Sequence, residues 1–444
     1  MFTTMRQLFF LSLLGLSSTW LWSLAGAAPL DGLTSSPDAS GAAAAAAWPY
    51  GPFTTSGRDI KNANNETIVF AGTNWPGHGE VMIPEGLQYQ SIETIVTKIR
   101  SIGMNAVRLT YAIQLVDEIY ANNGADITVK AAFAQGLGSV NGSAVYAQFL
   151  AKNPQFNDQT TRLQVYDAVA AELARQKVYI DLDNHMSRGA WCCSDTDGNA
   201  WPGDVDFNEQ NWYRGINYMA NHARNWPAVV TMSMRNEFRT PNASPELAAT
   251  KYNWAEWYRF EKIAAAQIHA GNPDVLIVLS GLNYDTYLTP LVQGTAFTPG
   301  TETFNPTGDF AGFSEKLVLE LHNYETGATS CSGLQSSMSS KGYQAMHAEI
   351  STTKHVMPVL MTEFGFSQDA TEWKKVYATC IADLLTKEKS GWFIWVLVGS
   401  YYIRSGTQDY DESWGLLTHD WSAWRSPSYL EGGLGPLIKA TSSG

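Results

Sequence analysis

Polar and charged residues stand at the ends of several short apolar runs of the sequence. Arg108, His185 and the pair Asn236-Glu237 each close or follow a run rich in Val, Ile or Leu, and Glu363 follows another. Two carboxyl groups brought together in one site can divide the roles of acid, base and nucleophile between them, because their surroundings separate their pKa values. The pattern therefore indicates a hydrolytic site built on two glutamates.

Eight apolar runs of this kind are spread along the chain, with room for a helix between most of them. The majority are continuous rather than alternating, which is typical of strands buried on both faces of a parallel sheet. The runs cover residues 67–72, 105–110, 178–183, 229–234, 275–280, 317–321, 358–362 and 392–398.

Helical periodicity fills most of the intervals. The predicted helices cover residues 91–102, 161–176, 212–225, 254–270, 343–350 and 371–387. Strand and helix in alternation predict an α/β fold, a single (β/α)8 TIM barrel with long rim loops over residues 51–444. An open doubly wound sheet is the alternative, but no Gly-rich phosphate loop follows the first strand. The long interval 111–160 is expected to be a loop that forms a wall of the site.

The first residues of the chain form a targeting segment. Residues 1–27 combine one basic residue (Arg6), an apolar run over 8–24 and the small residues Ala25-Gly26-Ala27, as in a secretory signal peptide. An uncleaved membrane anchor is the alternative, since the apolar run approaches spanning length. Residues 28–50 are a leader rich in Ala, Ser and Gly. The protein is therefore expected to be secreted and extracellular.

Export makes disulfides and glycans relevant. Four cysteines are present: Cys192, Cys193, Cys331 and Cys380. Four thiols allow three pairings, and we expect one member of the adjacent pair to bond with Cys331, because adjacent cysteines rarely bridge each other. Three asparagines stand in glycosylation sequons, which are expected on surface loops. They are Asn65, Asn141 and Asn242.

Composition excludes several classes of protein. The 444 residues are 45% hydrophobic and 16% charged, which rules out a disordered chain, a collagen and a coiled coil. The 42 acidic and 29 basic residues give a net charge of −13, so neither nucleic acid nor a membrane surface is an expected partner. We expect no metal and no cofactor, since the sequence has no His-x-x-x-His pair, and no Ser hydrolase, since it has no Gly-x-Ser-x-Gly elbow.

The two glutamates fall on the fourth and seventh predicted strands. The tips of these strands can place two carboxyl groups roughly 5 Å apart, the separation of a retaining glycosidase. Arg108 and the Tyr324 hydroxyl would keep Glu363 ionised as the nucleophile. The negative charge of Glu363 would in turn keep Glu237 protonated as the acid/base.

From about residue 53 to residue 424 the chain resembles the family-five glycoside hydrolases, a retaining clan with its glutamates on strands four and seven. The resemblance is carried by Arg108, His185, Asn236, Glu237, His322, Tyr324, Glu363 and Trp395. It implies that Asn236 holds the 2-hydroxyl of the reacting sugar and that Trp395 forms the stacking floor of that sugar. One departure is Phe238, which stands where the family usually has proline.

The segments 72–78, 82–87 and 105–111 resemble secreted fungal members of this family. These include diglycosidases that release rutinose, a rhamnosyl-glucose, from flavonoid glycosides such as rutin. The resemblance implies a β-glucoside substrate and a rutinosidase able to transfer sugar to alcohols as well as to water. The long 111–160 loop would leave room for two sugar units. The alternatives are an endo-β-1,4-glucanase, or another secreted β-glucan hydrolase, and a non-catalytic sugar-binding barrel.

Aromatic faces stack on sugars, so three tryptophans are candidate outer subsites. They are Trp75, Trp191 and Trp414.

Overall fold

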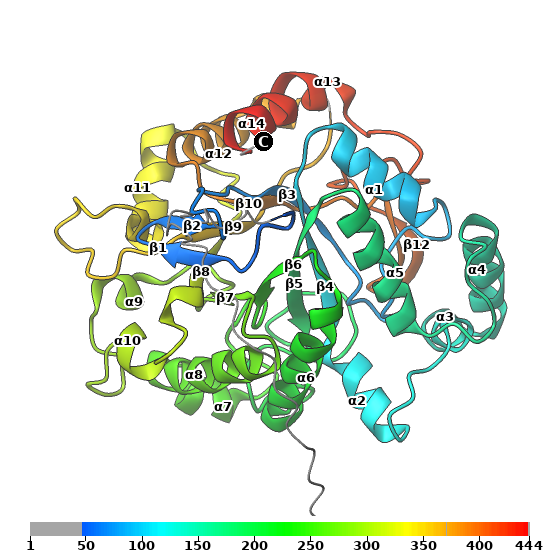
Figure 1. Ribbon diagram of the computed structural model, residues 1–444, viewed down its shortest axis with the longest axis horizontal. Coiled ribbons are helices and arrows are strands. Elements are labelled where there is room, and N and C mark those ends of the chain that lie inside the picture. The colour runs from blue at the N-terminus through cyan, green and yellow to red at the C-terminus, as the bar shows by residue number, and fades with distance from the viewer. Residues whose placement is uncertain (1–46, 370, 443–444) are drawn as a thin grey trace, which may run out of the picture. The chain divides into compact units, whose positions relative to one another are not determined.

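Eight strands close into a parallel barrel in the order β10-β3-β4-β5-β6-β7-β8-β9 (Figure 1). Their bounds are β3 Ala71–Trp75, β4 Ala106–Ala112, β5 Tyr179–Met186, β6 Val229–Ser233, β7 Leu276–Leu279, β8 Leu317–Asn323, β9 Val359–Phe364 and β10 Trp392–Ile394. This computed structural model describes residues 47–369 and 371–442. The predicted signal peptide 1–27 and most of the predicted leader lie outside the described residues.

Helices surround the barrel and confirm the predicted (β/α)8 architecture (Figure 1). The main ones are α1 Ile92–Ser101, α5 Arg162–Arg175, α6 Glu209–His222, α8 Trp254–Gly271, α11 Cys331–Lys341 and α12 Val376–Glu388. Local sequence sets where they begin. Ser91 accepts a hydrogen bond from the backbone N–H of Thr94 at the start of α1, and Thr161 forms a capping box with Gln164 at the start of α5.

Two predicted elements were misplaced. The first barrel strand begins at Ala71 rather than at residue 67, and Phe70, the residue before it, packs in a small apolar cluster with Phe53. The predicted helix 343–350 is only a 3₁₀ turn over Tyr343–Met346. The helix of that interval is the earlier α11, a Ser-rich segment in which only Leu334 and Met338 are buried, so it lacks clear apolar periodicity.

Apolar side chains form two cores. The larger core lies between the strands and the helices and takes most of the buried aliphatic and aromatic residues. The smaller core gathers the first residues of the strands beneath a hairpin of β1 Thr54–Ser56 and β2 Asp59–Lys61. Because the strands are parallel, their first residues all lie at this apolar end of the barrel. The polar residues at the carboxyl ends of the strands therefore lie at the opposite end.

The interval 111–160, expected to be a loop, contains three helices: α2 Ile113–Ala121, α3 Val129–Leu137 and α4 Ser139–Lys152. The last two pack beside a distant hairpin of β11 Ser400–Arg404 and β12 Thr407–Asp411 (Figure 1). Gln408 joins them, because its side-chain N–H donates to Leu137 O at 2.9 Å and its Oε1 accepts from Asn141 at 2.6 Å. Helices α3 and α4 of this interval therefore contact the hairpin and help to hold it in place.

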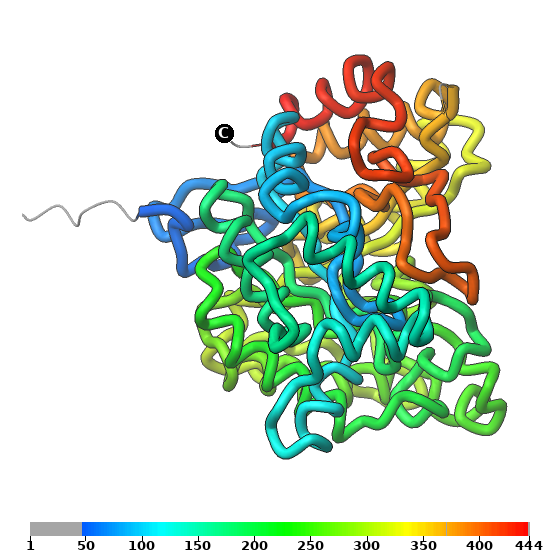
Figure 2. The backbone as a smooth tube through the Cα atoms, turned by 90° about the vertical axis from the view of Figure 1, so that its right-hand side faces the viewer, coloured from blue at the N-terminus to red at the C-terminus, as the bar shows by residue number. Residues whose placement is uncertain are grey.

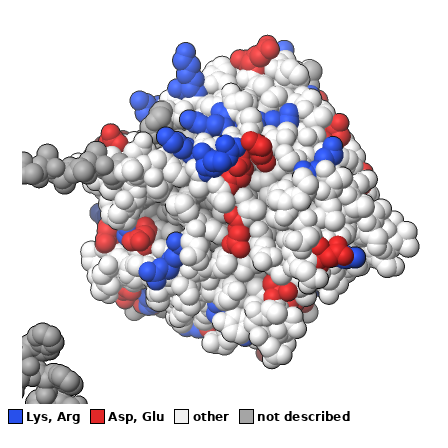
Figure 3. All heavy atoms as spheres, turned by 45° about the vertical axis from the view of Figure 1, so that its right-hand side comes forward, with Lys and Arg blue, Asp and Glu red and all other residues white. Residues whose placement is uncertain are grey.

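Shorter elements complete the described chain. They are α7 Pro245–Lys251, α9 Thr289–Gln293, α10 Pro306–Asp309, α13 Pro427–Tyr429 and α14 Gly435–Thr441. The C-terminal segment, red in Figure 2, packs against α12. None of the helices in the described ranges has the length and apolar character needed to cross a bilayer. On the face drawn in Figure 3, acidic and basic side chains are both present and most of the surface carries neither.

The predicted cysteine pairing is wrong. Cys192 bonds with Cys193, and Cys331 bonds with Cys380. Cys331 begins α11 and Cys380 lies within α12, two helices that pack together and bring the two Cα atoms to 4.9 Å, within the usual range for a disulfide. Cys192 and Cys193 lie in the segment between β5 and α6.

Candidate active site

The carboxyl ends of the barrel strands gather every residue of the predicted polar set around one pocket. This pocket has a volume of about 250 Å³. Its lining residues are His185, Trp191, Cys192, Cys193, Glu237, Tyr324, Glu363, Trp395, Arg404, Glu412 and Trp414. The other predicted members, Arg108, Asn236 and His322, are buried and hold or contact the two glutamates and their neighbours.

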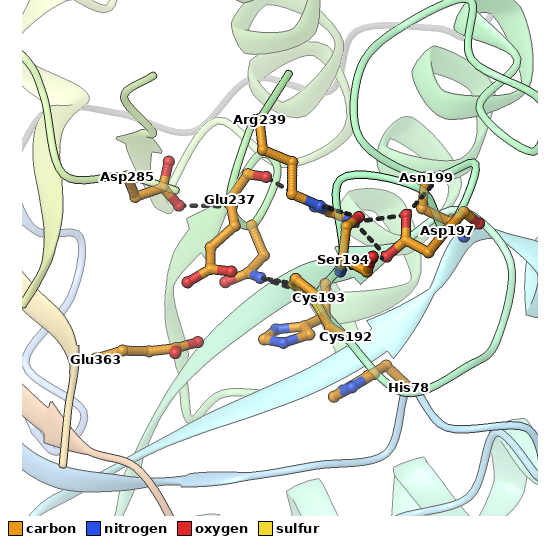
Figure 4. The surroundings of a disulfide bond; sticks show 12 residues. His78, Cys192, Cys193, Ser194, Asp197, Asn199, Glu237, Arg239, Asp285 and Glu363 are labelled. Atoms are coloured by element: carbon orange, nitrogen blue, oxygen red, sulfur yellow. Dashed lines mark hydrogen bonds and ion pairs between the residues drawn. A yellow bond between two sulfur atoms is a disulfide. The ribbon is translucent and has the colours of Figure 1, made fainter. Parts of the chain in front are cut away.

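The two glutamates face each other in this pocket (Figure 4). A carboxylate oxygen of Glu237 and one of Glu363 lie within 4.8 Å of each other, with a ring nitrogen of His322 inside the same limit. Retaining glycosidases place their carboxyl groups about 5–5.5 Å apart, whereas inverting enzymes leave about 6.5–9.5 Å for a water. The separation therefore suits a nucleophile and an acid/base.

Two hydrogen-bond donors bind the carboxylate group of Glu363. Arg108 Nη1 donates to one oxygen at 2.9 Å, and the Tyr324 hydroxyl donates to the other at 2.8 Å. Burial raises the pKa of Glu363, and repulsion from Glu237 raises it further, whereas His322, Arg108 and Tyr324 all lower it. The partners thus stabilise the ionised form that a nucleophile requires.

Glu237 is held through its backbone instead. Its N–H donates to Asp285 Oδ2 at 2.6 Å, and its carbonyl oxygen accepts from Arg239 Nη1 at 2.8 Å. These contacts fix a left-handed backbone with φ of 50°, which is uncommon for a residue with a side chain. A proline at position 238 would restrict the backbone of the residue before it, and Phe238 imposes no such restriction.

Burial favours the protonated form of the Glu237 carboxyl group. It contacts His322 Nδ1 at 2.9 Å, and burial raises its pKa to about 7. The predicted cause, repulsion from Glu363, was wrong in emphasis, because burial is the largest cause here and Asp183 is the charge that raises the pKa most in addition. Burial also lowers the pKa of His322 to about 4, so that imidazole is neutral beside the carboxyl group near neutral pH.

Arg108 is the centre of a buried polar network beneath the pocket. Besides Glu363, its guanidinium contacts the side-chain oxygens of Asn74 at 3.1 Å, Asn236 at 3.0 Å and Asp183 at 2.9 Å. Asp181 and Glu320 lie slightly further away, at 3.5 and 3.8 Å. One arginine therefore faces four acidic side chains in the barrel interior. Burial raises the pKa of Asp181 and of Asp183 to about 6 and that of Glu320 to about 8.

Two aromatic rings, those of His185 and Trp395, line the pocket beside this network. His185 stacks on Trp395 with the ring centroids 5.5 Å apart and the planes 15° apart, and it also stacks on His78 with the centroids 4.0 Å apart. The ring is oriented by Asp183, whose Oδ2 lies 2.6 Å from His185 Nδ1. A flat surface of this kind can stack on the C–H face of a sugar.

Two of the three candidate outer subsites lie at the pocket and one does not. Trp191 and Trp414 line the pocket, whereas Trp75 is fully buried and donates its indole N–H to Glu85 O at 3.0 Å. Trp75 ends a strand whose five residues are all buried, so its ring packs in the core instead of on the rim.

Four pocket residues were not predicted as part of the site: Cys192, Cys193, Arg404 and Glu412. Arg404 ends β11, pairs with Glu412, and holds its guanidinium 3.7 Å from the ring centroid of Trp191. The sequence signal for this hairpin is the dipeptide Ser405-Gly406, which stands between the two strands. Both residues have positive φ, as a two-residue hairpin turn requires. For the disulfide, no spacing rule favours adjacent cysteines.

Among the described residues, two groups of side chains have atoms close enough for metal ligation. One is Glu237, His322 and Glu363, whose positions suit the carboxylate chemistry above. The other is His185 with Cys192 and Cys193, whose sulfur atoms are bonded to each other and therefore are not the thiolates that ligate metals.

Known proteins resemble the chain over most of its length. A family model, cellulase (glycosyl hydrolase family 5), matches residues 61–400. A glycosyl hydrolase 5 family protein of Chamaecyparis obtusa is 33% identical over 389 residues, which is 85% of this chain and 65% of the relative. The chain thus spans less than two thirds of the length of that relative. An endoglucanase of Paenibacillus polymyxa is 20% identical over 398 residues, 85% of each chain.

Solved structures share the fold. The endocellulase of Pyrococcus horikoshii has a TM-score of 0.63 at 17% identity, covering 87% of this chain and 98% of that one. The catalytic domain of the major endoglucanase of Xanthomonas campestris has a TM-score of 0.59 at 18% identity, covering 88% and 99%. These likenesses show the barrel, and the family model adds the assignment: the chain belongs to glycosyl hydrolase family 5, the cellulase family, whose members are retaining glycoside hydrolases.

Proposed function

We propose that this chain is a retaining β-glycosidase that releases rutinose from flavonoid rutinosides such as rutin by double displacement. The observation that carries the catalytic part is the pair of facing glutamates, one bound by Arg108 and Tyr324 and the other with a pKa of about 7. The rutinoside part rests on the shape of the pocket and on the resemblance of the segments 72–78, 82–87 and 105–111 to secreted diglycosidases.

In the first half-reaction the Glu363 carboxylate attacks the anomeric carbon of the reacting sugar. The glycosidic C–O bond breaks as a glycosyl–Glu363 ester forms, and Glu237 gives its proton to the departing aglycone oxygen. As the family resemblance implies, Asn236 would hold the 2-hydroxyl and Trp395 would lie under the sugar ring. Protonation prevents the departure of a bare alkoxide, which is the costly part of the step.

In the second half-reaction Glu237, now ionised, takes a proton from a water molecule. The resulting hydroxide attacks the anomeric carbon, the ester bond to Glu363 breaks, and the sugar leaves with its original configuration. An alcohol can take the place of water, in which case the product is a new glycoside. Glu237 returns to its protonated state, so the enzyme is regenerated.

The small volume of the pocket supports a short glycone. Its volume of about 250 Å³ lies just below the range of about 300–1,000 Å³ typical of small-ligand sites. Arg404, the last residue of β11, and Glu412, the residue directly after β12, line one side of it, and α3 and α4 contact that hairpin. The interval 111–160 supplies none of the pocket lining described above, so it would limit the glycone indirectly, by holding the hairpin in place.

An endo-β-1,4-glucanase is the second candidate. The family model is that of the cellulases, the Paenibacillus polymyxa relative is an endoglucanase, and the Pyrococcus horikoshii endocellulase is described in complex with cellotetraose. This activity would use the same two glutamates and would need further sugar subsites beside Trp191 or Trp414.

Product analysis separates the two candidates. The purified protein is incubated with rutin, with isoquercitrin, which carries glucose alone, and with a soluble β-1,4-glucan. Release of intact rutinose, with little glucose from isoquercitrin, supports the proposal. Short oligosaccharides from the glucan with rutin untouched would refute it and favour the endoglucanase. Binding without any product would favour the sugar-binding barrel.

Secretion and glycosylation are part of the same proposal. The three sequon asparagines, Asn65, Asn141 and Asn242, are all exposed, so an attached glycan would not displace core residues. Asn141 lies in α4 rather than in a loop, which differs from the expectation. Mass spectrometry of the secreted protein, before and after removal of N-glycans, tests occupancy and the mature N-terminus together.

A further inference from the structure

The Cys192–Cys193 disulfide lies in the wall of the pocket that holds the two glutamates. Both cysteines line this pocket, and Figure 4 shows them beside Glu237, on the side toward His78. Glycosidic double displacement needs neither a thiol nor a disulfide, so the reaction itself does not account for this pair.

The sulfur atoms contact a side chain that the reaction uses. Asn236 Nδ2 lies 3.5 Å from Cys192 Sγ and 3.6 Å from Cys193 Sγ, while Asn236 Oδ1 accepts a hydrogen bond from Arg108 Nη2 at 3.0 Å. The carboxamide is therefore held at both ends. An amide nitrogen carries two hydrogens, so one can point at the sulfurs while the other remains for a ligand.

We propose that the Cys192–Cys193 disulfide is a positioning element for Asn236: it holds the carboxamide so that its second N–H faces the 2-hydroxyl of the reacting sugar. The inference rests on the proposed function in so far as a sugar must occupy the pocket. Sulfur accepts hydrogen bonds only weakly, so the disulfide orients the amide without competing strongly with a hydroxyl group for it.

The covalent bond matters because two free thiols cannot reproduce this surface. Bonded sulfurs lie about 2.05 Å apart, far closer than non-bonded sulfur atoms approach. On reduction at least one side chain must therefore turn away from its partner, and the paired contact with Asn236 is lost. Each new S–H group also adds a donor beside an amide that itself donates.

The second disulfide of the chain provides a matched control. Cys331–Cys380 joins α11 to α12, and neither cysteine lines the pocket. Its removal opens a loop with a sequence separation of 49, so it should lower the melting temperature through the unfolded state. The vicinal pair closes no such loop, and its removal should affect the site more than stability.

The test compares two double variants, Cys192→Ala/Cys193→Ala and Cys331→Ala/Cys380→Ala, on an aryl β-glycoside and on its 2-deoxy analogue. We expect the first variant to lose about 10- to 100-fold in kcat/KM on the parent substrate, the range for one hydrogen bond at a reacting centre. On the 2-deoxy analogue it should lose less than about threefold, since the hydroxyl that Asn236 would hold is absent. The control variant should keep its kcat/KM on both substrates and melt at a lower temperature.

Asn236→Ala completes the comparison. Combined with Cys192→Ala/Cys193→Ala, it should cause little further loss in kcat/KM, because both changes remove the same interaction. Equal losses on the two substrates, additive losses with Asn236→Ala, or an unchanged kcat/KM in the first variant would each overturn the proposal.

Reduction gives an independent readout in the Cys331→Ala/Cys380→Ala background. Dithiothreitol transfers two electrons and two protons to the Cys192–Cys193 bond, which becomes two thiols, while the reagent closes to its cyclic disulfide. Activity should fall as alkylation and mass spectrometry detect the thiols, and should return on reoxidation with oxidised glutathione. Full activity with both thiols free would overturn the proposal. If rutinosides are not cleaved but aryl cellobiosides are, the proposed function fails, and the same ratios on the cellobioside still test the disulfide.

Discussion

Glu363 and Glu237 approach within 4.8 Å of each other, yet the protein holds them by different atoms. Glu363 lies inside strand β9, and its carboxylate is bound directly by Arg108 and Tyr324. Glu237 lies beyond the end of β6, and Asp285 and Arg239 bind its backbone N–H and C=O.

The difference matches the two roles. A nucleophile should stay ionised and in place, so donors on its oxygens serve it well. An acid/base must lose and regain a proton in each cycle, and strong donors on its carboxylate would lower its pKa too far. Anchoring through the backbone fixes the position of Glu237 while its carboxyl group contacts one neutral histidine, His322.

The largest expected effect comes from removing the nucleophile. Glu363→Ala should lower kcat by about 10⁴-fold or more, because no other group can form the covalent intermediate. The circular dichroism spectrum should be unchanged, and calorimetry should show that the variant still binds sugar. A non-catalytic sugar-binding barrel would instead show unchanged behaviour throughout.

Removal of the acid/base should cost less, and the cost should depend on the leaving group. Glu237→Ala should slow natural glycosides by about 10²- to 10⁴-fold, the usual contribution of a general acid. Aryl glycosides with acidic phenols should still form the intermediate, and azide should restore turnover with a β-glycosyl azide as product. A folded variant that azide does not rescue would contradict the role assigned to Glu237.

Loss of the backbone anchor tests the other half of the comparison. Asp285→Ala leaves the buried N–H of Glu237 without its acceptor, so we expect kcat to fall by about 10- to 100-fold with a smaller change in KM. The neighbouring Thr286→Ala removes two hydrogen bonds with Asn283 within the same turn and none with Glu237, so it serves as control. If both variants keep wild-type kcat, the backbone of Glu237 needs no anchor.

Tyr324→Phe should have a milder effect on rate and a diagnostic effect on pH dependence. The hydroxyl lowers the pKa of Glu363, so its loss should raise that pKa. Since Glu363 acts as the anion, the acid limb of the kcat/KM profile should move to higher pH, with a loss of about 10-fold at the optimum. An unmoved acid limb would mean that Tyr324 does not act on the nucleophile.

The smallest expected effect concerns the wild-type protein, in the alkaline limb of the plot of kcat/KM against pH. Glu237 acts as an acid with a pKa of about 7, so kcat/KM should be retained below pH 7 and should fall about tenfold per unit above it. In Glu237→Gln this limb should vanish for substrates that need no protonation. A wild-type limb above pH 9 would assign the proton to another group.

Much of the barrel could be predicted because parallel strands leave a strong signal. Each of the eight apolar runs overlaps a barrel strand, and the polar residues at their ends lie around one pocket. Helix α11 could not be predicted, because Ser residues occupy most of its exposed face and only Leu334 and Met338 mark the buried one. The three helices of the interval 111–160 were not predicted, because the length of this interval suggests a loop.

Within the site, the rules of composition and spacing reached the residues on strands and missed those on the hairpin and the disulfide. Arg404 and Glu412 pair with each other, and only the three-dimensional return of the hairpin brings them to the pocket. Trp75 shows the opposite error, because aromatic character alone does not say whether a ring faces the rim or the core.

The acidic side chains around Arg108 make folding of this barrel a proton-binding reaction. Burial holds the pKa of Asp181 and of Asp183 at about 6 and that of Glu320 at about 8, whereas carboxyl groups of an unfolded chain titrate near 4. Between these values the three carboxyl groups bind more protons in the folded chain than in the unfolded chain, so their contribution to the free energy of unfolding should fall as pH rises from about 4 through 8, whereas His322, with its pKa lowered to about 4, contributes in the opposite direction. The same interior that keeps the acid/base protonated below pH 7 thus favours the folded enzyme in mildly acidic surroundings.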